Sequence, residues 1–213
     1  MTCEYNMLFG WYQGWKTNLG GSIMFKKSLM QKLTTEEWQS MDDDAQSEML
    51  DTRTKLLSGQ AYALAVPNRR HQRILGQMFT QFSVFLQGKA CEIYPTPFSV
   101  RLDATKDTTF EPDITVICDR DKLTDAGCEG APDLLIEILS PSTSRWDKCV
   151  KFEEYLKAGV REYWIVDPVD QLVAVHILNA GEYSTKVYGN EGAVPVHVLP
   201  GFSVDMAPVF EEI

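Results

Sequence analysis

A single glutamate interrupts an otherwise aliphatic run of the chain, and this feature restricts the fold more than any other. Residues 133–140 read Asp-Leu-Leu-Ile-Glu-Ile-Leu-Ser, which gives Glu137 aliphatic neighbours on both sides. An apolar run of this length between turn residues is typical of a strand that is covered on both faces. A carboxylate in such a strand is costly unless a cation or hydrogen bonds compensate its charge. We therefore expect a covered sheet with a polar site inside it.

Helices are predicted on either side of this run. The first long helix covers residues 69–87, because Ile74 and Met78 belong to a series of apolar residues at helical spacing. The second covers residues 144–158, which follow a Pro-Ser-Thr-Ser sequence and precede a glycine. A shorter helix is expected to begin at Thr34-Thr35-Glu36-Glu37, where a threonine followed three residues later by a glutamate fits a capping box.

The other patterned segments are predicted strands, separated by loops that contain proline, glycine or aspartate. They cover residues 92–102, 113–118, 133–139, 162–167, 171–179, 181–188 and 194–199. The order α, β, β, β, α, β, followed by additional strands, predicts an α+β (mixed α/β) fold with a mixed sheet. Residues 1–33 show neither the two-residue period of a strand nor the 3.6-residue period of a helix, so we interpret them as an N-terminal extension. One domain is then expected over residues 34–213.

Composition excludes several classes of protein. The 213 residues include 30 acidic and 20 basic side chains, and the formal charge of −10 argues against a broadly basic nucleic-acid coat or an affinity for anionic membranes. The five cysteines are odd in number and form no CxxC pair, which favours reduced thiols. No stretch approaches the roughly 18 apolar residues of a membrane span, and no signal peptide is apparent. We expect a cytoplasmic protein without a membrane partner.

A second group of carboxylates precedes another apolar strand. Asp113 opens the run Ile-Thr-Val-Ile, and Glu111 lies two residues earlier, across a proline. If the two strands are neighbours, Asp113 and Glu137 can meet and bind a hard divalent ion such as Mg²⁺ or Mn²⁺ through oxygen. Two alternatives need no chemistry: Asp113 ends a turn after proline, and Glu137 forms a buried ion pair with an arginine.

The helix that follows the second strand carries a candidate basic residue. Asp147, Lys151 and Tyr155 form an i, i+4, i+8 stripe on it. A lysine that faces two carboxylates can polarise a phosphoryl oxygen or orient a water. The same spacing is also that of an ordinary i, i+4 surface ion pair between Asp147 and Lys151, and spacing alone favours this second interpretation.

Several phrases together resemble one known family. They are Glu-Pro-Asp-Ile at residues 111–114, Ala-Pro-Asp-Leu-Leu-Ile-Glu-Ile-Leu-Ser-Pro-Ser-Thr at 131–143, then Asp147, Lys151 and Tyr155, and Ala-Gly-Val-Arg-Glu-Tyr-Trp-Ile-Val-Asp-Pro at 158–168. This pattern is similar to the Uma family of restriction-endonuclease-like proteins, within the PD-(D/E)xK nuclease superfamily. The resemblance extends from about Leu33 to Phe210.

The resemblance implies a restriction-endonuclease-like αβββαβ core, a mixed sheet flanked by helices, with additional β-hairpins. It also implies that Asp113 and Glu137 are the motif acids. The superfamily's usual lysine, two residues beyond the second acid, would fall at Leu139 and is absent. In this family the basic residue is expected on the next helix, where Lys151 matches and Lys148 is the nearby competitor.

The sequence departs from the family pattern upstream of the first long helix. Two glutamates expected from the resemblance are replaced by Lys55 and Gln60. If either glutamate binds metal in relatives, the site here is weakened or lost. The sequence His71-Gln-Arg-Ile does match the expected start of the long helix. His71 is a candidate contact for the scissile phosphate or a water, and its alternative role is structural.

These observations lead to two hypotheses of function. The first is a Mg²⁺- or Mn²⁺-dependent endonuclease that hydrolyses DNA phosphodiester bonds, with Asp113 and Glu137 as metal ligands and Lys151 stabilising the transition state. Accessory roles are assigned to Glu111, His71, Lys148 and Tyr155. The second is a catalytically degenerate member of the fold that acts as a nucleic-acid or protein binding module. In either case a homodimer is expected, since restriction-like nucleases often pair.

Overall fold

The computed structural model describes residues 33–34, 54–57, 60–63, 68–105, 109–140 and 146–211, with side chains placed at 68–105, 109–140 and 149–211. A six-stranded mixed sheet forms the centre of this part of the chain. Its strands lie in the order β12-β11-β10-β9-β6-β4. Their bounds are β4 (Glu92–Pro95), β6 (Ile114–Ile117), β9 (Leu134–Ile138), β10 (Glu162–Asp167), β11 (Leu172–Asn179) and β12 (Glu182–Tyr188).

Strand direction follows from the connections between strands. Strands β9 and β10 pair in parallel, and the other neighbouring strands of this sheet pair antiparallel. A parallel pair needs a crossover connection, and here it contains a π-type turn (Trp146–Lys151) followed by α4 (Phe152–Ala158). Gly159 ends α4 at a positive φ of 83°, a backbone conformation that favours glycine.

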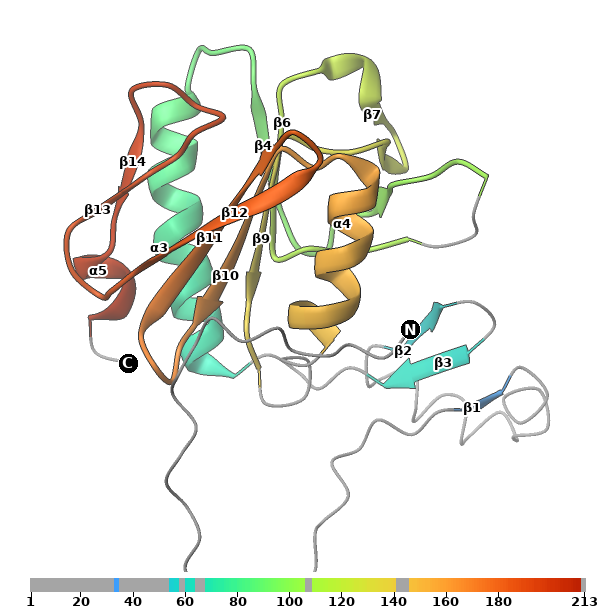
Figure 1. The fold of residues 1–213 in the computed structure, drawn as a ribbon, viewed down its shortest axis with the longest axis horizontal. Coiled ribbons are helices and arrows are strands. Elements are labelled where there is room, and N and C mark those ends of the chain that lie inside the picture. The colour runs from blue at the N-terminus through green and yellow to red at the C-terminus, as the bar shows by residue number, and fades with distance from the viewer. Residues whose placement is uncertain are drawn as a thin grey trace, which may run out of the picture.

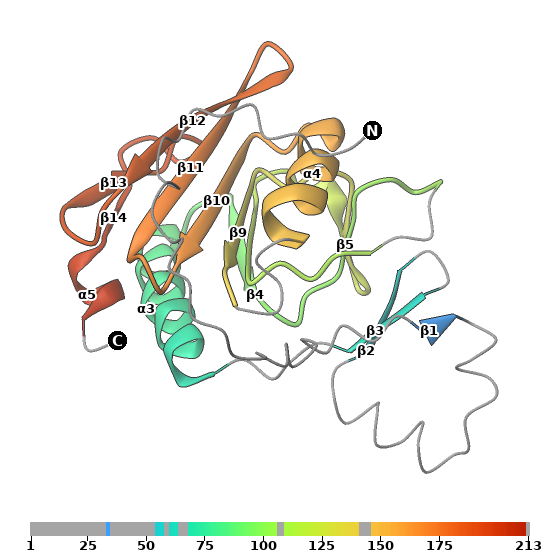
Figure 2. The same cartoon turned by 60° about the horizontal axis from the view of Figure 1, so that its bottom comes forward.

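The sheet is covered on both faces, as Figures 1 and 2 show: α3 (Arg69–Leu86) packs on one face and α4 on the other. Alternation along β9 explains this arrangement. Ile136 and Ile138 belong to the buried cluster that includes Ile74 and Met78 of α3, and Leu135 belongs to the cluster on the α4 face. The strand is therefore apolar on both faces, and Glu137, next to Leu135 in this alternation, faces α4.

Smaller elements surround this core. A three-stranded sheet contains β5 (Val100–Arg101), β8 (Gly127–Glu129) and β7 (Leu123–Thr124), with a short 3-10 turn at Arg120–Lys122. The C-terminal part forms the pair β13 (Ala193–Pro195) and β14 (Ser203–Asp205) and the short helix α5 (Ala207–Phe210). Upstream, β1 (Leu33–Thr34), β2 (Thr54–Leu57) and β3 (Gln60–Ala63) form a sheet in the order β1-β3-β2.

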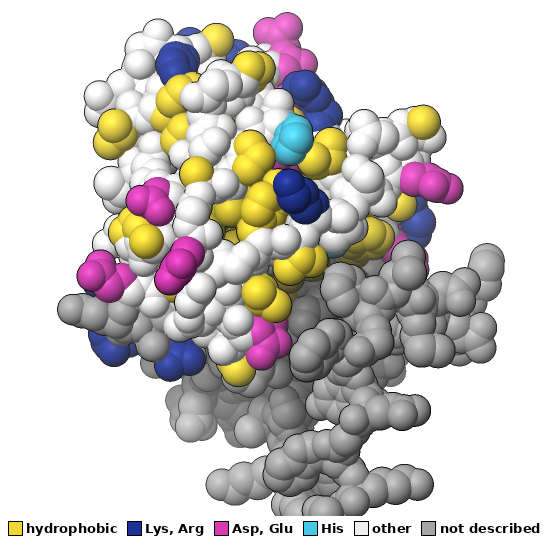
Figure 3. All heavy atoms as spheres, turned by 60° about the vertical axis from the view of Figure 1, so that its left-hand side comes forward, with side chains coloured by type: hydrophobic (Ala, Val, Ile, Leu, Met, Phe, Trp, Pro, Cys, Tyr) yellow, Lys and Arg dark blue, Asp and Glu magenta, His cyan; other side chains and the backbone are white. Residues whose placement is uncertain are grey.

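The C-terminal elements lie beside α3 and close the core on that side (Figure 1). Phe202 stacks on Phe85 of α3, with 4.4 Å between the ring centroids, and Arg73 of α3 donates a hydrogen bond to the carbonyl of Glu211. Seen from this side, hydrophobic side chains are spread over the surface, and acidic side chains are scattered around it without forming one patch (Figure 3). α3 is thus held between the sheet and the C-terminal segment.

The predicted fold class is confirmed. The order α3, β4, β6, β9, α4, β10 is the expected αβββαβ core, and β11 and β12 form an added hairpin. The strand predicted at residues 92–102 was wrong in its extent: β4 ends at Pro95, and β5 belongs to another sheet. Proline lacks the amide that a ladder needs, and a second proline follows at position 97. The strand predicted at 194–199 is likewise shorter and earlier, at Ala193–Pro195.

Two predictions fall largely outside the described residues. Thr34, the first residue of the expected early helix, lies in β1, and the rest of that helix is outside the described ranges. The boundary between an extension over residues 1–33 and a domain over 34–213 stays a prediction. In the part of the chain that the structure describes, no helix is long and apolar enough to cross a membrane.

The expectation that all the cysteines are reduced was wrong for one pair. Cys91 and Cys118 form a disulfide. The two residues lie just beyond the paired residues Glu92 and Ile117 of β4 and β6, so the register of these strands brings them together. No short-range cysteine motif predicts this disulfide, because the two residues are separated by 27 positions in the sequence. Among the described residues, Cys128 is a buried free thiol.

Candidate active site

Asp113 and Glu137 lie next to each other at one end of strands β6 and β9. These strands are antiparallel, with Ile114 opposite Ile136, so one further step places Asp113 beside Glu137. The Asp113 carbonyl accepts a hydrogen bond from the Thr96 amide at 2.9 Å, and its carboxylate Oδ2 accepts one from the Ile138 amide at 2.8 Å. Hydrogen bonds from the chain beyond β4 and from β9 thus fix Asp113.

His71, in the first turn of α3, completes the surroundings of Asp113. Its Nε2 lies 3.1 Å from Asp113 Oδ2, and the two side chains are 8% and 14% exposed. The start of α3 is itself fixed, because the Asn68 side chain accepts a hydrogen bond from the His71 amide at 2.9 Å. Asp113 Oδ2 therefore has a contact from a backbone amide and one from an imidazole.

Glu137 meets two side chains from the crossover helix. Lys151 Nζ lies 2.7 Å from Glu137 Oε1, and the Tyr155 hydroxyl donates to the same oxygen at 2.8 Å. Lys151 and Tyr155 are four residues apart, so they lie on the same side of a helix. The Glu137 side chain is 4% exposed and that of Lys151 13%, which makes this a buried ion pair.

Aromatic packing holds the Tyr155 hydroxyl in place. Tyr155 is fully buried, and its ring makes edge contacts with Phe110 and Tyr163, with centroid distances of 5.4 and 5.0 Å. Tyr163 lies on β10, next to the strand that carries Glu137. The phenol is thus oriented by its ring before it forms any hydrogen bond, so the bond to Glu137 requires little further ordering.

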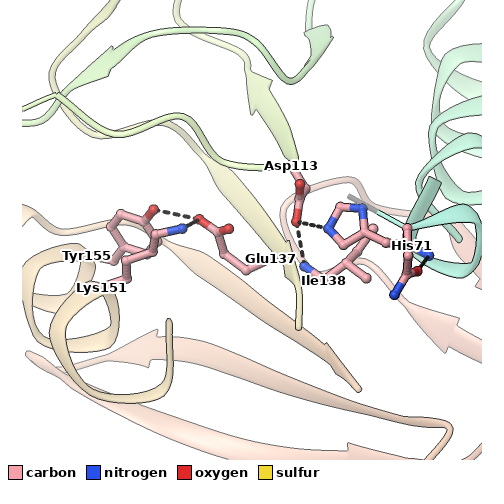
Figure 4. A network of polar contacts seen from close by, with 7 residues as sticks. His71, Asp113, Glu137, Ile138, Lys151 and Tyr155 are labelled. Atoms are coloured by element: carbon pink, nitrogen blue, oxygen red, sulfur yellow. Dashed lines mark hydrogen bonds and ion pairs between the residues drawn. The ribbon is translucent and has the colours of Figure 1, made fainter. Parts of the chain in front are cut away.

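The polar contacts form two groups that lie side by side. Figure 4 shows the Glu137 carboxylate directed toward Lys151 and Tyr155, and the Asp113 carboxylate in contact with His71 and the Ile138 amide. Within the described residues, no three His, Cys, Asp or Glu side chains gather as a metal cluster. A cation here would have two carboxylates as its side-chain ligands.

The chemistry of these donors fits a hard divalent cation. Mg²⁺ is usually bound in proteins through one or two carboxylates and keeps several waters. The continued register of β6 and β9 places Asp113 opposite Glu137 along the backbone, and each carboxylate is directed to its own partners, with the cation Lys151 beside Glu137 and the imidazole of His71 beside Asp113. The residues present are therefore compatible with Mg²⁺ or Mn²⁺.

The purely structural interpretations of Asp113, Glu137 and Lys151 can now be compared with this geometry. Lys151 is largely buried against Glu137, not exposed as a surface pair would require, and the side chain of Asp147 lies outside the described ones. The expected arginine partner of Glu137 is instead this lysine. Asp113 does more than end a turn, since its carboxylate connects β9 to α3.

Other predicted residues are less informative. Glu111 is half-buried in the loop that leads to Asp113. The side chains of Lys148, Lys55 and Gln60 lie outside the described ones, so their roles stay predictions. Sequence reasoning did not identify the backbone amide of Ile138 as a partner of Asp113, because that contact depends on strand register. Asn68 carried a usable signal, as an N-cap residue before an apolar helix.

Comparisons with known proteins agree with this fold. In the solved structures, a chain from Anabaena variabilis described as "a putative nuclease belonging to DUF820" is similar, with a TM-score of 0.61 and 20% identity over 84% of this chain and 97% of that one. An uncharacterized protein of Synechocystis is 29% identical over 124 residues, which are 58% of this chain. The match spans 62% of the length of that relative.

The family comparison covers most of the chain, including every residue of the site described above. The matching family is Uma2, described as "Putative restriction endonuclease", and the match extends over residues 37–207. This range includes α3, the whole six-stranded sheet and α4. The chain belongs to the Uma2 family of restriction-endonuclease-like proteins.

Proposed function

We propose that the protein is a metal-dependent endonuclease that hydrolyses DNA phosphodiester bonds at the site formed by Asp113, Glu137 and Lys151. Membership of a nuclease family and a nuclease-like fold support the general class. One observation carries the specific assignment: Lys151 Nζ, from the crossover helix, lies 2.7 Å from Glu137 on the strand next to Asp113. An acid, a second acid and a base come from three separate elements to one end of the sheet.

Asp113 and Glu137 are the proposed ligands of Mg²⁺ or Mn²⁺. When bound, the ion supplies charge neutralisation at the phosphate and lowers the pKa of an attacking water. The chain itself holds the two acids in place: Asp113 through the Ile138 amide and His71, and Glu137 through Lys151 and Tyr155. Such partners orient a carboxylate before it meets a cation.

Lys151 is the proposed electrostatic stabiliser of the reaction. An ammonium has three N–H donors, so the contact with Glu137 is compatible with a second donation to a phosphate oxygen. Because the side chain is 13% exposed, its charge acts in surroundings that screen it less than water does. Its place at the end of the π-type turn, just before α4, is proposed to substitute for the lysine that the superfamily pattern expects at position 139, which is a leucine here.

The overall charge of −10 requires that a polyanion be met locally. Arg69 and Arg70 are exposed in the first turn of α3, which also carries His71, and that turn contains no acidic residue. These arginines therefore lie near Asp113 in the fold. They are suited to contact phosphates that flank the one to be cleaved.

Cleavage of supercoiled plasmid tests this function. The wild type should nick the plasmid with Mg²⁺ and not with excess EDTA. Asp113→Asn and Lys151→Gln should each lower the rate by about 100-fold or more, the usual effect of removing one such electrostatic contact.

Asp133→Asn is the matched control, because Asp133 also accepts a backbone amide and pairs with a cation, Arg161, at the other end of β9. It should retain the wild-type rate. Absence of nicking by the wild type on plasmid and on single-stranded DNA, at any Mg²⁺ or Mn²⁺ concentration, would favour the degenerate binding module instead.

A homodimer belongs to the same proposal, because two copies of the chain can present one site to each strand of a duplex. Among the described strands, β12 forms an edge of the sheet and is mostly exposed, and an edge ladder of this kind is suited to pairing with a second copy. Sedimentation equilibrium should give a mass near twice 24.1 kDa. A monomer mass at micromolar concentration would contradict this part of the proposal.

A further inference from the structure

We infer that His71 is a positioning residue: its Nε2–H donates to Asp113 Oδ2 and so reserves Oδ1 of the same carboxylate for a cation. This inference rests on the proposed function, because it assigns one residue to the support of a proposed metal ligand. It differs from the role considered from the sequence, a direct contact with phosphate or water. His71 here acts only through Asp113.

The surroundings of the imidazole identify which nitrogen carries the proton. Among the described residues, His71 Nδ1 is buried and has no hydrogen-bond partner, whereas Nε2 lies 3.1 Å from Asp113 Oδ2. An N–H without an acceptor costs more in a buried position than an unused lone pair does. A ring with a single N–H therefore carries it on Nε2, where a carboxylate oxygen accepts it.

Two donors then share one oxygen of Asp113. The Ile138 amide donates to Oδ2 at 2.8 Å, and the His71 ring approaches the same atom. The two donors come from different elements, β9 and α3, so together they fix the plane of the carboxylate as well as its position. Residues that hydrogen-bond a metal ligand without touching the metal typically lower the metal affinity by 10 to 100-fold when they are removed.

Burial argues against a direct contact with substrate. The His71 side chain is 8% exposed, and its helix is held on the sheet through the fully buried Ile74 and Met78. The Asn68 cap fixes the backbone at the same turn. A ring in this position has little freedom to reach a phosphate, but it is rigid enough to orient a neighbour.

The first experiment measures Mn²⁺ binding by calorimetry in two variants. His71→Leu removes the donor and fills the space with an apolar side chain, and its affinity should fall by about 10 to 100-fold. His71→Gln places an amide nitrogen close to the position of Nε2, and it should restore most of the affinity. A merely structural role would make both variants equal.

The matched control is His176→Leu. His176 is also a buried histidine with an unpartnered ring nitrogen among the described residues, but it lies on β11, where its ring contacts Phe152 and Tyr163. This variant should lose stability and keep the wild-type Mn²⁺ affinity. Equal affinities of His71→Leu and wild type would overturn the inference, as would a loss in His176→Leu as large as that in His71→Leu.

The second experiment needs no metal and separates this inference from the proposed function. Nitrogen-15 NMR of the metal-free wild type should show the His71 tautomer with protonated Nε2. The Ile138 amide proton should exchange slowly with solvent in the wild type and faster in His71→Leu. If the wild type binds no Mn²⁺, the proposed function fails, and these spectra still decide whether His71 holds Asp113. The Nδ1-protonated tautomer would overturn the inference even if metal binds.

Discussion

Replacing Lys151 by methionine tests the buried ion pair at the candidate site. The change keeps most of the volume of the side chain and removes its charge, which leaves the Glu137 carboxylate, 4% exposed, without the cation that lies 2.7 Å away. Removing one partner of a buried pair typically costs 3–5 kcal/mol. Tyr155 continues to donate a hydrogen bond to Glu137, so we expect the lower end of that range, about 3 kcal/mol.

Urea unfolding monitored by circular dichroism measures this loss. With a slope of about 2 kcal/mol per molar urea, the midpoint should fall by about 1.5 M. Lys157→Met, on α4 in the same crossover connection, is the matched control. Lys157 also forms ion pairs, with Glu153 and Glu154, but its side chain is 62% exposed. Because exposed pairs contribute little, this variant should unfold close to the wild type.

A double variant separates the effect of charge from that of packing. Glu137→Gln in the Lys151→Met background removes the unpaired carboxylate, so most of the lost stability should return. The buried pair would be refuted as the source of the effect if Lys151→Met cost no more than Lys157→Met. A double variant as unstable as Lys151→Met alone would refute it as well.

Three further predictions concern other groups. Burial lowers the pKa of His176 from 6.5 to about 4; the stability that the neutral ring contributes is therefore complete above pH 6.5 and is lost as the pH falls toward 4, by about 3 kcal/mol. His176→Phe should flatten this part of the stability curve between pH 7 and 4, and an unchanged slope would contradict the assignment. Cys91→Ser should lower the free energy of unfolding by about 3 kcal/mol, because the disulfide with Cys118 closes a loop with a sequence separation of 27; dithiothreitol should then destabilise the wild type but leave the variant unaffected. Tyr155→Phe should cost about 1–3 kcal/mol, since it removes a donor to the buried Glu137, and a thermal melt identical to that of the wild type would show that this hydrogen bond contributes nothing.

Much of the core could be predicted from local pattern. The apolar residues at helical spacing located α3, and the aliphatic run around Glu137 located the central strand, because these signals depend only on the period of the side chains. The chemical cost of a carboxylate in that strand pointed to a compensating cation nearby. Lys151 at its helical position then supplied the partner, and the structure brings the two together.

What the sequence could not supply depends on contacts between distant segments. The contact between His71 and Asp113 joins residues 42 positions apart, and no local pattern encodes it. The disulfide between Cys91 and Cys118 depends on the register of β4 with β6. β5 pairs in a separate sheet, with β8. The alternation of residue types predicts a strand, but it does not indicate which strand will be its partner.

Calorimetric titration with Mn²⁺ tests the central claim, that Asp113 and Glu137 form one cation site, most directly. We expect the wild type to bind the ion, and Asp113→Asn to lose measurable binding while it stays folded. Asp133→Asn should bind as the wild type does, because Asp133 lies at the opposite end of β9 from Glu137. Equal binding by Asp113→Asn and wild type, or no binding by the wild type, would contradict the account.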